Sequence, residues 1–146
     1  MKLLNSVSKI KKKFLNKIKP TDKKLHEYIE EQTRAVMISA SLQDFNLLIK
    51  EVNMDGQCIM TMNVDYEYLR AYLEYDKKKL SPILKAGNQD EILRYICHEV
   101  AHIITSELVD TVGLSYKGHV KFYLERQTER VGRIIYSNYT KKNGKK

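Results

Sequence analysis

Apolar residues recur every three or four positions in several stretches of this 146-residue chain. That spacing predicts helices that bury one face. In residues 1–20 lysines lie between the apolar positions, which predicts a basic amphipathic helix that ends at Pro20. A second stripe of this kind predicts a helix over residues 23–40, and a third predicts a helix over residues 119–139.

Alternating positions predict strands in the middle of the chain. Residues 58–64 alternate in this way, and residues 66–75 are rich in aromatics that fit the same period of two. The pattern of residues 42–53 fits either a helix or a strand. Turn and loop signals separate these stretches at Met54-Asp55-Gly56, Ser81-Pro82 and Gly87-Asn88.

One more helix is expected to begin after Asn88. Asn88 followed by Glu91 resembles a capping box, in which side chains at both positions satisfy free backbone groups. Apolar residues then cover more than half of the helix circumference: Ile92, Leu93, Ile96, Cys97, Val100, Ala101, Ile103, Ile104 and Leu108. A helix that is apolar on so many sides is expected in the centre of a domain.

The net charge of +8 belongs to the two ends of the chain. Residues 1–24 hold nine lysines and one aspartate, and residues 141–146 hold four lysines, whereas residues 25–140 hold 13 basic and 17 acidic residues. Lysine-rich ends of this kind can attract nucleic acid or an anionic membrane surface. Alternatively, the stripe of the first helix covers the domain while its lysines face water.

Composition and length exclude several classes of protein. A hydrophobic content of 42% excludes a wholly disordered chain, and no apolar run reaches the ~18 residues of a membrane span. Two cysteines, Cys58 and Cys97, make no disulfide framework, so we expect a cytoplasmic protein, in the host cytoplasm if the chain is phage-encoded. We expect a basic helix over residues 1–20, one domain over residues 21–140, and a disordered tail over residues 141–146.

The predicted central helix contains the motif His98-Glu99-Val100-Ala101-His102. Residues four apart lie on one face of a helix, so both imidazoles can converge on one Zn²⁺. Glu99 is rotated by about 100° from His98 and is suited to act as general base toward a metal-activated water. The alternative is a solvated polar stripe on this helix.

A catalytic zinc site needs a third protein ligand. The candidates are Glu125, Glu129 and His119. Glu125 and Glu129 are one turn apart, so one could bind metal while the other accepts a hydrogen bond from a ligand histidine. The alternative is that both acids are ordinary charges on a helix surface, because arginines interleave with them.

With these motifs, residues of about 57–137 resemble the zincin metallopeptidases, and in particular the gluzincins and small zincin-like proteins of phages and prophages. In gluzincins a second helix carries a glutamate ligand, and an acid one turn later orients a ligand histidine; Glu125 and Glu129 match that pair. The resemblance implies an α+β fold with a short twisted sheet packed on the HExxH helix and a further C-terminal helix. It also implies a zinc-dependent hydrolase of peptide or protein substrates, which pair with an edge strand for which residues 66–75 are the candidate.

Two related families match less of the pattern. The ImmA/IrrE-like peptidases also pair HExxH with a downstream glutamate helix, but their Asn-x-Phe-Ala continuation is missing after Glu125. Gly118-His119-Val120-Lys121-Phe122 is similar to the third-ligand region of SprT-like proteases, which act on DNA-associated proteins, although the glycine here precedes the histidine. Metzincins are not matched, because no HxxGxxH continuation follows His102. A hypothesis of another class is a non-catalytic zinc-binding interaction module.

Overall fold

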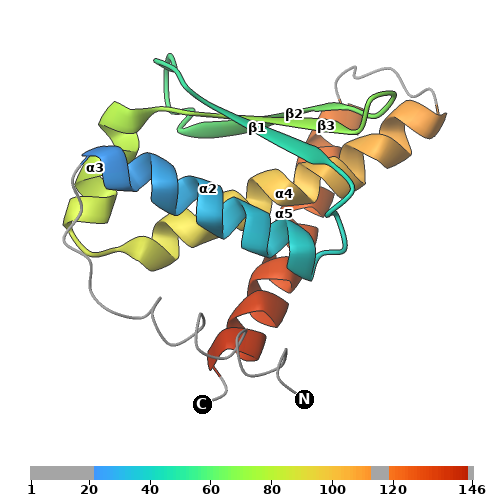
Figure 1. Ribbon diagram of the computed structural model, residues 1–146. Coiled ribbons are helices and arrows are strands. Elements are labelled where there is room, and N and C mark those ends of the chain that lie inside the picture. Colours follow the sequence, from blue (N-terminus) through green and yellow to red (C-terminus); the bar gives the residue numbers. More distant parts are fainter. Residues whose placement is uncertain (1–21, 113–118, 145–146) are drawn as a thin grey trace.

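The protein has a mixed α+β structure with four helices and one three-stranded sheet among the described residues. The structure, a computed structural model, describes residues 22–112 and 119–144, except for the side chains of residues 22–23, 108–112 and 119–120. The helix expected over residues 1–20 lies outside the described residues. The sheet lies on one side of the molecule, and the helices pack beneath it (Figure 1).

The first described helix, α2, confirms the prediction for residues 23–40. It runs over Asp22–Ser39 and buries Leu25, Ile29 and Val36 completely or nearly so. These residues occupy one face, as the apolar spacing predicts. The buried hydroxyl of Thr33 donates a hydrogen bond of 2.7 Å to the backbone oxygen of Ile29, so this polar side chain is satisfied within the helix.

The sheet consists of β1 (Asn46–Glu51), β2 (Met60–Asp65) and β3 (Arg70–Tyr75) in the order β1-β3-β2. The ambiguous stretch 42–53 therefore contains a strand. Strand β3 pairs parallel with β1 and antiparallel with β2, and it buries alternate residues against the helices.

The prediction that residues 66–75 form an edge strand is wrong. Residues 66–69 form a turn, in which Leu69 has a positive φ of 49°, and the strand that follows is central. The alternation of side chains in β3 reports which residues are buried, but it carries no information on the number of neighbouring strands. Pairing with the distant β1 makes this strand central, so β1 and β2 are the edges.

The loop predicted at Ser81-Pro82 is also wrong, because α3 runs through it over Lys77–Lys85. The Asp76 carboxylate caps this helix and accepts hydrogen bonds from the backbone N–H groups of Lys78 (2.9 Å) and Lys79 (3.3 Å). The helix also buries Leu80 and Leu84. Proline costs the helix one backbone hydrogen bond, and the cap and the buried leucines offset that cost.

Helix α4 (Gln89–Val112) forms the centre of the fold, and the more exposed α5 (His119–Gly144) packs against it. Ile92, Ile96, Val100 and Ile103 of α4 are completely buried, which confirms a central helix. It packs against β2 on one side and against α2 and α5 on others. Helix α5 extends five residues past the expected end at 139, so residues 141–144 are helical where a disordered tail was expected.

None of the helices in the described parts of the chain combines the length and the apolar content that crossing a bilayer requires. This finding agrees with the absence of a long apolar run in the sequence.

Candidate metal centre

The HExxH motif lies in the middle of α4 and forms a compact cluster. One ligand atom from each of His98, Glu99 and His102 lies within 4.8 Å of the other two. The two imidazole rings are 5.0 Å apart between centroids and nearly perpendicular. The unbroken helix from Gln89 to Val112 produces this arrangement, because residues four apart are neighbours on its surface.

Helix α5 brings Glu125 to the Nε2 atoms of both histidines. Glu125 Oε2 lies 3.8 Å from His98 Nε2, and its Oε1 lies 3.9 Å from His102 Nε2. In a tetrahedral zinc site, bonds of ~2.0–2.1 Å separate ligand atoms by roughly 3.3–3.4 Å. The two separations from Glu125 are therefore within about half an ångström of that spacing.

Glu129, one turn later on α5, contacts the other ring nitrogen of His98. Its Oε2 lies 3.2 Å from His98 Nδ1, and its Oε1 accepts a hydrogen bond of 2.8 Å from the Nε of Arg133. The hydrogen bonds from Arg133 and then from His98 hold the pKa of Glu129 below its usual value. An ionised carboxylate can only accept, so Nδ1 of His98 is the donor in this contact, and Nε2 is the ring nitrogen that faces Glu125.

The donor set suits a divalent cation. Burial lowers the pKa of His102, although the charge of Glu125 opposes this, and a lowered pKa favours the neutral imidazole that metals bind. Within the described residues, the Glu125 carboxylate lies beside His98 and His102, at separations too long for hydrogen bonds. Each oxygen of the Glu125 carboxylate faces one of the two imidazoles, and imidazole nitrogens and carboxylate oxygens are ligand types that Zn²⁺ binds.

Glu99 lies on the side of α4 that faces the sheet, and its residue surface is only 8% exposed. Burial raises the pKa of Glu99 to about 8; a hydrogen bond from the backbone N–H of Met62 opposes this shift, and the charge of Glu125 adds to it. Met62 lies on the edge strand β2. The carboxyl group can therefore hold or release a proton near neutral pH beside the two histidines.

Two contacts between α4 and α5 hold the cluster together. The hydroxyls of Thr105 and Thr128 are buried and 2.8 Å apart, and Gly132 lies directly against the backbone of His98. No sequence pattern linked Met62, Thr128 or Gly132 to the candidate metal centre, although Met62 lies in a predicted strand and Thr128 in the apolar stripe of the predicted last helix. For Gly132 a signal was present, since glycine inside a helix often marks a close approach, whereas the contacts of the other two depend on how the elements pack.

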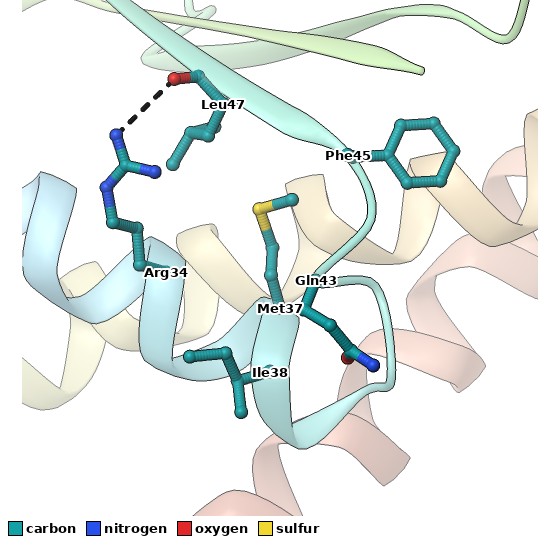
Figure 2. Close-up of a pocket in the computed structure, with 6 residues that line it drawn as sticks. All are labelled: Arg34, Met37, Ile38, Gln43, Phe45 and Leu47. Carbon is teal, nitrogen blue, oxygen red and sulfur yellow. Dashed lines mark hydrogen bonds between the residues drawn. The ribbon is translucent and has the colours of Figure 1, made fainter.

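The described residues line two hollows, and one of them borders the candidate metal centre. A groove of about 420 Å³ runs between α4 and α5 on the Nδ1 side of His98 and is lined by Arg94, Tyr95, His98, Glu129, Gly132, Arg133 and Tyr136. A smaller pocket of about 140 Å³ lies between α2 and β1, away from the histidines, and Figure 2 shows Met37, Phe45 and Leu47 around it. Only the first is continuous with the candidate metal centre.

The structure thus brings together His98, Glu99, His102, Glu125 and Glu129. The side chain of the other predicted ligand, His119, lies outside the described residues. Comparisons of the chain with protein-family models, with curated proteins and with solved structures found no match.

Proposed function

We propose that this protein is a zinc-dependent metallopeptidase in which His98, His102 and Glu125 hold the metal. The observation that carries the proposal is the convergence of Glu125 on the Nε2 atoms of both histidines at 3.8 and 3.9 Å. The two acids of α5 divide the roles as the gluzincin resemblance implies, because Glu129 contacts the Nδ1 of His98. A zincin-like arrangement of the α+β fold is part of the proposal.

Zinc, when bound, supplies a Lewis acid that activates water and polarises the carbonyl of a peptide bond. The remaining roles belong to the chain. Glu99 takes a proton from the attacking water at a carboxylate oxygen and passes it to the nitrogen of the leaving amine. Burial beneath β2 restricts bulk water around this carboxyl group, and the Met62 N–H orients it.

A peptide substrate would pair with β2 and not with the stretch 66–75. Strand β2 is an edge of the sheet and packs against α4, so its free edge borders the helix that carries the histidines. An extended peptide can add to such an edge through backbone hydrogen bonds. Its scissile bond would then lie along the line of Met62 and Glu99.

The proposal is tested by measuring metal content and peptide hydrolysis on the same purified full-length protein. Glu99→Gln should retain stoichiometric zinc by elemental analysis and lose hydrolysis of a mixed peptide library by at least about a hundredfold, because proton transfer supplies roughly 10²–10⁴-fold. His98→Ala should lose both zinc and activity. Glu31→Gln, which removes an exposed charge on α2, is the matched control and should change neither.

Wild-type protein without stoichiometric zinc would refute the metal site. Zinc without hydrolysis in the wild type would instead favour the non-catalytic zinc-binding module.

A further inference from the structure

Gly132 lies in the middle of α5, where glycine disfavours a helix. A Cβ at this position would lie 3.1 Å from the Cα of His98 and 3.3 Å from both the backbone oxygen of Cys97 and the backbone nitrogen of His98. These are backbone atoms of α4, so they cannot rotate out of the way as a flexible side chain would. Because Gly132 has no side chain, the backbone of α5 can pack directly against the backbone of α4 at His98.

The same face of α5 carries the two acids of the candidate metal centre. Glu125, Glu129 and Gly132 follow one another at spacings of four and three, which places them one above another on a helix. Any outward movement of α5 at Gly132 would also displace Glu125 from both Nε2 atoms and Glu129 from the Nδ1 of His98. The existing separations of 3.8 and 3.9 Å leave little room for such a movement.

A second contact prevents α5 from sliding along α4. Thr128 lies between the two acids in sequence, and its hydroxyl is buried against that of Thr105, which also donates to the backbone oxygen of Ala101 at 3.1 Å. This hydrogen bond sets the register of α5 along α4. Gly132 sets the separation, because even a Cβ at this position would press against the backbone of α4 at 3.1–3.3 Å.

We propose that Gly132 is a positioning residue of the metal centre, which seats α5 on the backbone of His98 so that Glu125 can share one ion with both histidines. This inference rests on the metal site of the proposed function but not on peptide hydrolysis. Its distinguishing consequence is that a better helix former at position 132 should weaken metal binding.

The test compares Gly132→Ala and Gly132→Val with wild type and with Asn138→Ala. Asn138 is exposed on the same helix, so its replacement raises helix propensity without contact to α4. Zinc dissociation constants are measured by competition with a chromophoric chelator, and coordination is followed in the visible spectrum of the Co²⁺-loaded protein. Gly132→Ala should weaken zinc binding about tenfold, in the range found for residues that orient ligands, and should change the Co²⁺ spectrum. Gly132→Val should weaken it further, and Asn138→Ala should do neither.

Each outcome decides between the alternatives. If Gly132→Ala binds zinc as tightly as wild type with the same Co²⁺ spectrum, the inference is wrong while the proposed function stands. If Gly132→Ala loses its cooperative thermal transition with and without zinc, Gly132 serves the fold in general and the inference is also overturned. If wild type binds zinc but cleaves no peptide, and Gly132→Ala binds more weakly, the proposed function fails and the inference holds. A wild type that binds no zinc refutes both.

Discussion

Two clusters of electronegative atoms in this protein are built in opposite ways. Around Lys79 the chain supplies the cation itself, because the ammonium group donates to the backbone oxygens of Met54 (2.6 Å), Gly56 (2.9 Å) and Cys58 (2.8 Å). Around Glu125 the chain supplies two imidazole nitrogens and a carboxylate that face one another. The first cluster is complete within the protein, and the second has the composition of a site for an added cation.

The comparison suggests that the polar groups around Lys79 stabilise the fold, whereas those around Glu125 are suited to bind a ligand. In the first cluster, Lys79 and the Asp76 carboxylate, which also accepts from the Met54 N–H at 2.9 Å, tie the segment between β1 and β2 to the start of α3. In the second, the charge of Glu125 adds to the raised pKa of the buried Glu99, so the two carboxylates oppose each other's ionisation when no cation lies between them. Substitutions should therefore separate the two clusters cleanly.

The largest effect is expected at the proposed metal centre. Glu125→Gln keeps the shape of the side chain but removes the charge, so zinc affinity should fall by about a hundredfold or more. This loss exceeds the roughly ten- to hundredfold that is typical when a residue that only hydrogen-bonds to a metal ligand is replaced. The melting temperature of the apo protein should stay the same or rise, because a repulsive charge is gone. Chelator competition and apo thermal melts measure the two quantities. Unchanged affinity would remove Glu125 from the ligand set.

Lys79→Met should show the opposite pattern. Three carbonyl oxygens lose a charged donor, so the free energy of unfolding should fall by about 2 kcal/mol, in the range for one hydrogen bond to a charged group and partly compensated by water. Zinc affinity should stay within twofold of wild type. Lys78→Met, at an exposed neighbouring side chain, is the matched control in denaturant titrations. A loss of zinc affinity in Lys79→Met would show that the two clusters are coupled.

Glu129→Gln should have a smaller effect than Glu125→Gln on the same metal centre. The glutamine oxygen can still accept from His98 Nδ1, but the charge that Arg133 and His98 share is lost. Zinc affinity should fall about tenfold. Glu129→Leu, which can accept no hydrogen bond, should bind zinc more weakly than Glu129→Gln, and equal affinities in both variants would argue against a role for this hydrogen bond.

The smallest effect is expected for the pH dependence of stability that Asp76 causes in the cluster around Lys79. Hydrogen bonds from Met54, Lys79 and Lys78 hold the pKa of Asp76 below its ordinary value of 3.8, and the first of these contributes most. A lowered pKa in the folded state means that the ionised form stabilises the protein above pH ~4, and that this contribution is lost as the pH falls through the folded-state pKa. Asp76→Asn should therefore be less stable than wild type at pH 7 in denaturant titrations. The gap should narrow toward pH 3, and a gap independent of pH would contradict the assignment.

Local patterns in the sequence were enough to predict most helices and strands, but they did not predict which of these elements lie next to one another. The apolar stripes predicted α2, α4 and all of α5 up to residue 139, because a helix buries whichever face its own side chains make apolar. The Ser81-Pro82 signal misled, since Asp76 and two buried leucines outweigh a single proline. The central place of β3 could not be read from its alternation, because it depends on pairing with a strand far away in the chain.

At the candidate site, too, some features follow from the local sequence and others from tertiary packing. The sequence alone determined that His98 and His102 share a face and that Glu99 points elsewhere, because the helix repeat is set by the backbone. It also narrowed the candidates for a third metal ligand to a few residues, of which Glu125 and Glu129 lie one turn apart. Only the tertiary structure decided that Glu125 faces both Nε2 atoms and Glu129 faces Nδ1. The reason is that the rotation and separation of α5 on α4 are set by packing at Thr105, Thr128 and Gly132, and no local pattern encodes how two helices meet.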